Sequence, residues 1–294
     1  MNKKRERREE GKIRLSGRLS AIASFVPAGS VAADVGTDHG YIPLWLVKEG
    51  ICPAAIAMDV RPGPLERAAA HVREAGCSDR ISLRLSDGLD ALLPGEAGAV
   101  IIAGMGGPLT VQILERGRRV WESWEPERER LILSPHSETA GVRAFLEEAG
   151  FLILRETMVR EEGKYYVIME AARGRMRPLT EAEREFGPCL LRDGHPLLAE
   201  YLKKEKETAR ALIGRLEAAM GNFPRVKEPD AADGSGTKEA AGRPGRTDAE
   251  NRLAARQEEL CARIRMIEEA EDEMQRNNQR AGEAGASLDG LRLG

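Results

Sequence analysis

Short apolar runs alternate with longer stretches of mixed polarity from residue 14 to residue 170. The runs are rich in aliphatic and β-branched residues, as buried strands are, and the stretches between them repeat apolar residues at helical spacing. We therefore predict strands at residues 31–35, 54–60, 81–85, 99–103, 131–134, from 151 onward and 165–170.

The stretches between the strands predict the connections. They indicate helices at residues 15–26, 41–49, 62–75, 109–118 and 139–149. Strands that alternate with helices form a doubly wound α/β fold, here a mostly parallel, seven-stranded sheet. Only the turn at residues 161–164 joins the last two strands, so we expect one antiparallel strand at the edge of the sheet.

The pattern changes near Gly174, and we assign residues 1–173 to the α/β domain. Two later stretches space their apolar residues alternately by four and three, which is the seam of a coiled coil. They predict an antiparallel helical hairpin over residues 174–276, interrupted by a flexible Gly- and Pro-rich loop at 222–247. Residues 277–294 lack periodicity and are predicted to be a disordered tail.

The turn after the first predicted strand runs from Asp34 to Tyr41 and reads Asp-Val-Gly-Thr-Asp-His-Gly-Tyr. A dinucleotide site requires G-x-G-x-x-G, because its glycines let the backbone approach a pyrophosphate. Here Asp38 stands at the middle glycine. Its charge would repel a pyrophosphate and suits the sulfonium and amino groups of S-adenosylmethionine, as does Asp34. The alternative is a turn that binds no ligand.

Two further loops are predicted at the same edge of the sheet. Asp59 ends the second strand, roughly 20 residues after the turn, where an acid reaches ribose hydroxyls. Asp87, before Gly88, is placed to accept a hydrogen bond from an adenine amino group. The fourth strand ends at Ala103-Gly-Met-Gly-Gly107, where glycines let a flat group approach the main chain. Each loop also has a purely structural interpretation, as a turn or a tight helix entry.

Two kinds of base methylation are disfavoured. The Asp/Asn-Pro-Pro-Tyr/Phe sequence typical of methylation at the adenine amino group is absent after the fourth strand. Methylation at C5 of cytosine needs a nucleophilic cysteine, and none lies near either glycine-containing loop.

The segments Asp34-Val-Gly-Thr-Asp-His-Gly-Tyr-Ile-Pro43 and Ala103-Gly-Met-Gly-Gly107 together resemble the bacterial tRNA (adenine-22-N1)-methyltransferase family, the TrmK family. The likeness covers residues 14–170 and continues more weakly through Phe186-Gly-Pro188 and the hairpin. It implies a class I (Rossmann-like) methyltransferase domain and a C-terminal coiled-coil domain. It also implies S-adenosylmethionine as cofactor and N1 of adenine 22, in the D-arm region of tRNA, as the methylated atom.

This chain departs from the family pattern at two places. The loop at residues 222–247 is longer than the hairpin turn expected for the family. Ser134-Pro135-His136 stands where a Gln-Pro pair is expected after the fifth strand. Either difference bears on how the substrate is held rather than on the cofactor.

The turn chemistry and the resemblance together suggest residue roles. The N1 lone pair of adenine needs no strong base, so the enzyme must orient the base and stabilise the charge on the product. For this catalytic role we predict Asp38, His39 and the main chain of Met105. The predicted cofactor-binding residues are Asp34, Gly36, Asp38, Gly40, Asp59, Asp87, Gly88, Ala103, Gly104 and Gly106. The predicted substrate-binding residues are Tyr41, Gly107, Arg14 and Arg18.

Composition limits the partners, metals and cellular location that we expect for this protein. The net charge of −3 does not by itself indicate nucleic acid, but residues 1–20 hold eight basic residues against three acidic ones and can attract phosphate. The four cysteines form no CxxC pair, so we expect no metal and a reducing compartment. Neither a signal peptide nor an apolar run of ~18 residues is present, so we expect no membrane span and a cytoplasmic location.

The residues alone are also compatible with other functions. They are a methyltransferase for another RNA or for a small molecule, and a non-catalytic interaction protein that binds S-adenosylmethionine and recruits partners through its coiled coil. An NAD-linked oxidoreductase is disfavoured by Asp38. We expect a monomer, with dimerisation through the coiled coil as the alternative.

Overall fold

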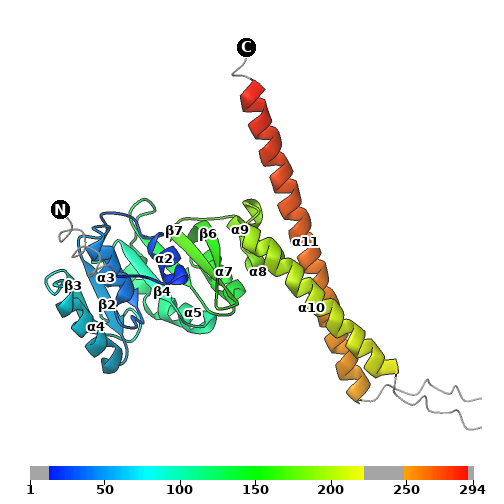
Figure 1. Ribbon diagram of the computed structural model, residues 1–294, viewed down its shortest axis with the longest axis horizontal. Helices are drawn as coiled ribbons and strands as arrows, with labels where there is room; N and C mark the ends of the chain where they lie inside the picture. Colours follow the sequence, from blue (N-terminus) through cyan, green and yellow to red (C-terminus); the bar gives the residue numbers. More distant parts are fainter. Residues whose placement is uncertain (1–12, 222–247, 291–294) are drawn as a thin grey trace, which may run out of the picture. The chain divides into compact units, whose positions relative to one another are not determined.

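The computed structural model describes residues 13–221 and 248–290, and it contains one mixed sheet (Figure 1). The strands are β1 (Ala32–Val35), β2 (Ala55–Asp59), β3 (Ile81–Leu85), β4 (Ala99–Ala103), β5 (Arg130–Ser134), β6 (Phe151–Glu161) and β7 (Lys164–Arg173). Their order is β3-β2-β1-β4-β5-β7-β6. The prediction of a seven-stranded, mostly parallel α/β sheet is confirmed.

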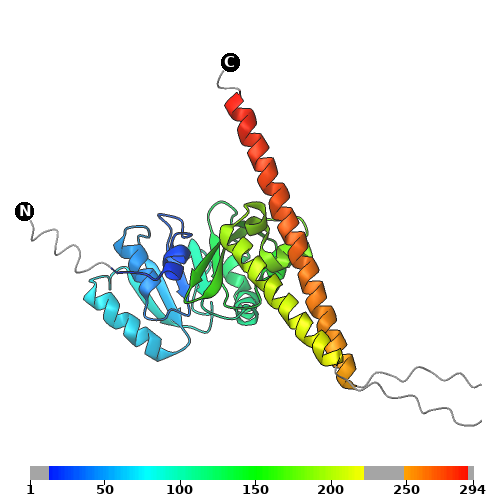
Figure 2. The same cartoon turned by 45° about the vertical axis from the view of Figure 1, so that its right-hand side comes forward.

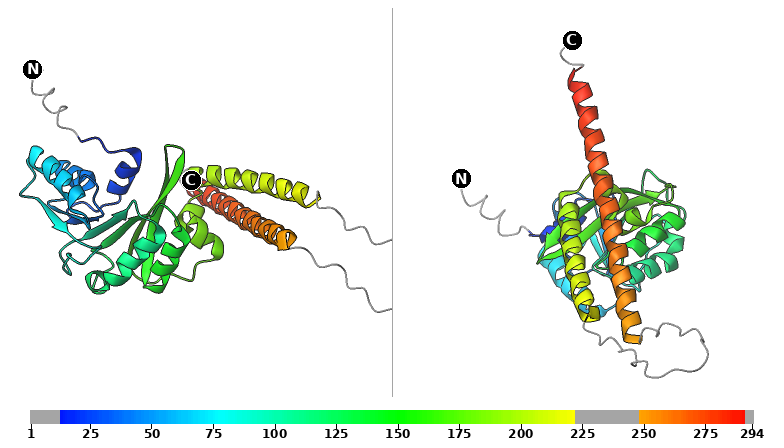
Figure 3. Two further views of the ribbon diagram at one scale, coloured as in Figure 1. Left: turned by 90° about the horizontal axis from the view of Figure 1, so that it is seen from below. Right: turned by 90° about the vertical axis from the view of Figure 1, so that its right-hand side faces the viewer.

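Helices cover both faces of this sheet (Figure 3). One face carries α2 (Gly17–Ala23), α3 (Tyr41–Lys48) and α4 (Pro62–Glu74), and the other carries α5 (Gly107–Arg116), α6 (Arg118–Trp121) and α7 (Thr139–Glu148). The alternation of side chains along each strand divides the core accordingly. In β1, Ala32 packs with α2 and α3, whereas Ala33 and Val35 pack with α5, α6 and α7.

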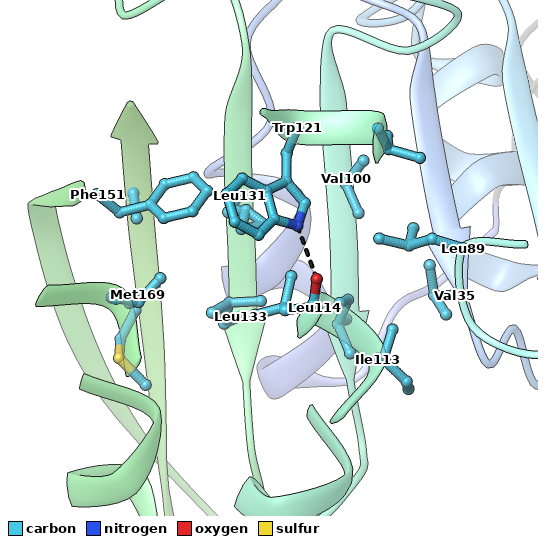
Figure 4. Close-up of a cluster of buried hydrophobic side chains, with 14 of the residues drawn as sticks. Val35, Leu89, Val100, Ile113, Leu114, Trp121, Leu131, Leu133, Phe151 and Met169 are labelled. Carbon is cyan, nitrogen blue, oxygen red and sulfur yellow. Dashed lines mark hydrogen bonds between the residues drawn. The ribbon is translucent and has the colours of Figure 1, made fainter. Parts of the chain in front are cut away.

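The larger cluster of buried side chains lies beneath α5, α6 and α7 (Figure 4). Trp121 packs at a tilt on Phe151, with ring centroids 5.1 Å apart, and edge-on against Phe145 at 6.4 Å. Its indole N–H donates to the carbonyl of Leu114 at 2.8 Å, as the dashed line in Figure 4 shows. The Trp121 side chain is therefore both buried and hydrogen-bonded, which anchors α6 against the sheet.

Strand order changes direction beside β1. The chain runs from β1 through β2 to β3 on one side, and then crosses to β4 and β5 on the other. At such a switch point the loops that leave two neighbouring strands diverge and open a crevice at the carboxyl ends of the strands. The turn that follows β1 and the loop that follows β4 border this crevice.

The expectation that the antiparallel strand lies at the sheet edge is wrong. β7 pairs antiparallel with both β5 and β6, so it lies between them, and β6 is the edge strand. Burial explains the order: residues 168–172 of β7 are all buried, whereas β6 alternates buried and exposed positions. A strand covered on both faces belongs inside a sheet, and a half-covered one tolerates the edge.

The compact unit that contains the sheet extends past the expected boundary at Gly174, to Leu198, and also includes the described residues from Glu273 onward. Two short helices, α8 (Glu181–Phe186) and α9 (Pro188–Arg192), belong to it and were not predicted from the pattern. A capping box at Thr180 and Glu183 begins α8, and both side-chain to main-chain bonds of the box are present. The compact unit therefore does not end at the change in composition near Gly174.

A fully buried ion pair connects α8 and α9 to the sheet. Arg143 Nε donates to Glu156 Oε1 at 2.8 Å, and both side chains are 0% exposed. Arg143 Nη1 also donates to the carbonyls of Arg184 and Glu185, and Glu156 Oε2 accepts from the main-chain N–H of Cys189. One pair of charges thus holds main-chain groups at the end of α8 and in α9.

The other compact unit, Ala199–Asp272, is a helical hairpin. It consists of parts of α10 (Pro196–Gly221) and α11 (Asp248–Gly290), which lie side by side (Figures 2 and 3). Arg210 pairs with Glu268 at 3.1 Å, and Gln257 donates to Glu217 at 3.1 Å. Since residue numbers rise along one helix as they fall along the other, the helices are antiparallel, as predicted.

The tail predicted to be disordered from residue 277 is helical as far as Gly290, because α11 continues past the end of its apolar seam. The predicted flexible loop at 222–247 and the basic residues 3–12 lie outside the described residues. In the two described ranges, no helix combines the length and apolarity that a membrane crossing requires.

The buried ion pair generates a stability prediction. Glu156→Gln leaves the buried Arg143 guanidinium without a counter-charge, which should lower the free energy of unfolding by roughly 3–5 kcal/mol. Urea denaturation followed by circular dichroism measures the change. Glu148→Gln, at an exposed position on α7, is the matched control and should shift stability by less than about 0.5 kcal/mol. Equal stability of the two variants would contradict the proposed role of the pair.

Candidate active site

Two main-chain N–H groups in the turn after β1 are already hydrogen-bonded within the protein. Gly36 has φ +75°, and the main-chain N–H groups of Gly36 and Thr37 both donate to the carbonyl of Met58 at 2.8 Å. A Cβ added to Gly36 would lie 2.2 Å from Cε of Met105, in the loop after β4. The positive φ therefore favours glycine at this position, and a side chain there would force the Met105 methyl group to move. The two amides are not available to bind a pyrophosphate.

A cavity of about 800 Å³ opens at the carboxyl ends of the parallel strands, beside this turn. Most of the residues predicted from the sequence line it. They are Arg18, Asp34, Gly36, Asp38, Tyr41, Asp59, Asp87, Gly88, Ala103, Gly104 and Met105. The fold thus brings together side chains from the turns after β1, β2, β3 and β4, as expected for ligand binding in a doubly wound fold.

Asp34 is the least compensated charge in this cavity. Its side chain is buried, and no cation in the described part of the chain pairs with it. Burial raises the pKa of its carboxyl to about 6, and the nearby charge of Asp59 adds to the shift. A buried carboxylate that remains largely ionised at neutral pH favours a cationic ligand.

The other three acids of the cavity have partners. Asp59 accepts from the main-chain N–H of Arg61 at 2.8 Å, and its carboxylate lies 3.6 Å from Nε of the same residue. Asp38 lies 3.3 Å from Arg67 and 3.4 Å from His39, and Asp87 lies 2.7 Å from Arg116. These partners hold the carboxylates in place while leaving oxygen lone pairs for a ligand.

Five predicted residues are not part of the cavity lining: Arg14, His39, Gly40, Gly106 and Gly107. His39 forms a cluster of stacked rings with Tyr41 and His71, with centroids 5.4 Å and 5.8 Å from its own and 5.3 Å from each other. Arg14 is exposed elsewhere on the surface. The predicted catalytic role of His39 and substrate-binding role of Arg14 therefore find no support in this geometry.

The three glycines outside the lining have structural roles. Gly40 adopts φ +69° as the residue before α3, where a Cβ would lie 3.0 Å from that of Ala68. Gly106 is the residue before α5. Gly107 is buried, and a Cβ there would lie 2.5 Å from the carbonyl oxygen of Glu138. Gly40 and Gly107 thus allow α3 and α5 to begin close to neighbouring elements, and the prediction that the three glycines contact ligand or substrate remains a prediction.

Several lining residues were not predicted, among them Arg61, Arg67, Leu109 and His136. His136 follows β5, and its Nε2 lies 2.6 Å from Nη1 of Arg18, which comes from α2. The signal in the sequence was the segment Ser134-Pro135-His136, which departs from the family pattern. That signal did not indicate which element His136 would face.

Comparison with known proteins agrees with a methyl-donor site. Residues 15–169 match the family model of a methyltransferase domain. A Bacillus subtilis (strain 168) tRNA (adenine(22)-N(1))-methyltransferase is 37% identical over 162 residues, which are 55% of this chain and 66% of that protein. This chain belongs to the TrmK family. The resemblance noted from the two loop segments is thereby confirmed.

Solved structures of TrmK proteins extend the match to the C-terminal helices. A Streptococcus pneumoniae protein, a candidate tRNA (m1A22) methyltransferase, is 32% identical with a TM-score of 0.68, over 87% of this chain and 99% of that one. A second structure of that protein is a complex with S-adenosyl-L-methionine. Bacillus subtilis TrmK is 28% identical with a TM-score of 0.68, over 88% of this chain and 99% of that one.

The ionisation of Asp34 generates a prediction about cofactor affinity. Its carboxyl must be charged to pair with a cation, so the affinity for S-adenosylmethionine should fall by up to about tenfold per pH unit below about 6. Calorimetric titration across the acidic range measures this. Asp34→Asn should bind more weakly and show a flatter pH dependence.

The unliganded Asp34→Asn variant serves as the folding control. A neutral amide avoids the cost of burying a charge, so this variant should melt at or above the wild-type temperature. Wild-type affinity with an unchanged pH profile in Asp34→Asn would exclude a contact between this carboxylate and the cofactor.

Proposed function

We propose that this protein methylates N1 of adenine 22 in tRNA, with S-adenosylmethionine as methyl donor. The observation that supports it most is the buried carboxylate of Asp34, with which no cation of the described residues pairs, beside turn N–H groups that already donate to the carbonyl of Met58. This environment suits a ligand with a cationic end and disfavours a diphosphate. Membership of the TrmK family supports the same assignment.

The residues of the cavity fit the parts of this cofactor. Asp34 would hold the amino group, Asp59 the ribose hydroxyls and Asp87 the amino group of the adenine. S-adenosylmethionine, when bound, supplies a methyl group already activated by the positive sulfur. The chain therefore needs no strong base, and its task is to aim N1 of the target base at the methyl group and exclude water.

The substrate side of the cavity is formed by different elements. N1 lies on the Watson–Crick edge of adenine, so the base must leave its stack before it can react. Tyr41, an exposed aromatic residue in the cavity lining, offers a surface on which such a base can stack. Arg18 contributes a positive charge to the same cavity and can contact a phosphate group. Asp38 and the main chain of Met105 remain the candidates for stabilising the charge of the product.

We further propose that the enzyme acts as a monomer in the cytoplasm, where tRNA is processed in bacteria. The helical hairpin would contact the tRNA backbone rather than a second copy of the chain. In the described residues, no cluster of His, Cys, Asp or Glu side chains has the arrangement needed to hold a metal ion.

The direct test is to map the methylated atom. An unmodified tRNA transcript is incubated with the protein and S-adenosylmethionine, and then reverse-transcribed. A methyl group at N1 blocks base pairing, so reverse transcription should stop next to adenine 22, and digestion should release 1-methyladenosine. A transcript with guanine at that position is the matched control and should show neither. Methylation at another atom, or none in tRNA, would reject the assignment.

A further inference from the structure

A group of three side chains from three distant segments borders the cavity next to Gly104 and Met105. Arg18 comes from α2, His136 from the loop after β5, and Tyr166 from β7. Nη1 of Arg18 lies 2.6 Å from Nε2 of His136, and its Cζ lies 4.9 Å from the ring centroid of Tyr166. The rings of His136 and Tyr166 meet edge to face, with centroids 5.5 Å apart.

The main chain fixes the position of this histidine. The N–H of His136 donates to the carbonyl of Met105 at 2.7 Å, so the loop after β5 is tied to the loop after β4. A Cβ built on Gly104 would lie 3.9 Å from Nε2 of His136. The imidazole therefore lies beside the glycine loop, where the flat target base enters under the proposed function.

The hydrogen bond between Arg18 and His136 identifies the protonation state of Nε2 of His136. A guanidinium group only donates, so Nε2 of His136 must carry a lone pair and accept. Partial burial lowers the pKa of His136, and the charges of Arg18 and Lys164 lower it further. The carboxylate of Glu161, which lies beside Arg18, accepts from the main-chain N–H of Arg18 at 2.9 Å. The imidazole is thus a neutral acceptor at neutral pH.

We infer that Nε2 of His136 accepts a hydrogen bond from the 6-amino group of the target adenine and so selects adenine over guanine. This inference rests on the proposed function. On the Watson–Crick edge of adenine, the amino donor is adjacent to N1, so a base aimed through N1 presents its amino group to a neighbouring acceptor. Guanine carries a carbonyl acceptor at that place, which would face the lone pair of the imidazole.

In the free protein, Nε2 of His136 is hydrogen-bonded to Arg18, and RNA binding can release it for the base. The guanidinium of Arg18 has several donors, and a phosphate group of bound RNA is a stronger partner for it than a neutral imidazole. Transfer of Arg18 to a phosphate would free Nε2 for the base. The accepted hydrogen bond also strengthens during the reaction, because methylation at N1 places positive charge on the ring and its amino group. The contact should therefore affect kcat more than substrate binding.

The test combines a change in the enzyme with a change in the substrate. Wild-type protein and His136→Ala are each assayed, at saturating S-adenosylmethionine, on tRNA with adenine or with purine riboside at the target position. Purine riboside retains N1 and lacks the amino group. With adenine, His136→Ala should lower kcat about tenfold or more, because the amino group loses its acceptor. With purine riboside, His136→Ala and wild type should have the same kcat.

Two variants complete the design. His136→Gln keeps an acceptor near the position of Nε2 and should restore most of the rate on adenine. Ser137→Ala changes the neighbouring exposed side chain, which does not line the cavity, and should match wild type. Calorimetry should give the same affinity for S-adenosylmethionine in His136→Ala and wild type, which shows that the cofactor site is intact.

An equal loss of kcat on both substrates in His136→Ala would overturn the inference, because His136 would then act without the amino group. Wild-type kcat on adenine in that variant would overturn it as well. Neither result touches the proposed function, which fails only if the wild-type enzyme does not methylate N1 of adenine in tRNA.

Discussion

The arrangement of the site depends on one charge without a cationic partner, the buried carboxylate of Asp34 near the end of β1. Its burial raises the pKa to about 6, so the free protein holds an ionised group at neutral pH in surroundings that favour the neutral form. A cationic ligand relieves that cost, and a diphosphate would increase it. The main-chain N–H groups of Gly36 and Thr37 also disfavour a diphosphate, because both donate to the carbonyl of Met58 and cannot donate to a ligand.

Cofactor and substrate are served by different parts of the fold. The carboxylates for the cofactor follow β1, β2 and β3, whose parallel order brings their ends to one edge of the sheet. The side chains assigned to the substrate are Tyr41 of α3, Arg18 of α2 and His136 in the loop after β5. Gly36 and Met105 join the two sides, because the side chain of Met105 packs against the main chain of Gly36. The cavity thus lies at a switch point of strand order where the loops after β1 and β4 are in contact.

Local patterns in the sequence predicted the parts of the structure that local patterns control. Buried strands such as residues 99–103, the turn after β1 and the acids after β2 and β3 each follow from a few adjacent residues. The position of β7 between β5 and β6 was not predictable, because strand order depends on tertiary pairing and the hairpin alone permits either order. His136 was missed for the same reason: its partners Arg18 and Tyr166 are distant in sequence, and only the fold brings them together.

The most direct test of the account is calorimetric titration of the wild-type protein with S-adenosylmethionine, its demethylated product S-adenosylhomocysteine, and NAD. The first two carry the amino cation that Asp34 can hold, and NAD carries a diphosphate that the turn cannot accept. The account predicts saturable one-site binding of S-adenosylmethionine and S-adenosylhomocysteine and no binding of NAD. Binding of NAD by a protein that ignores both of the other ligands would contradict it.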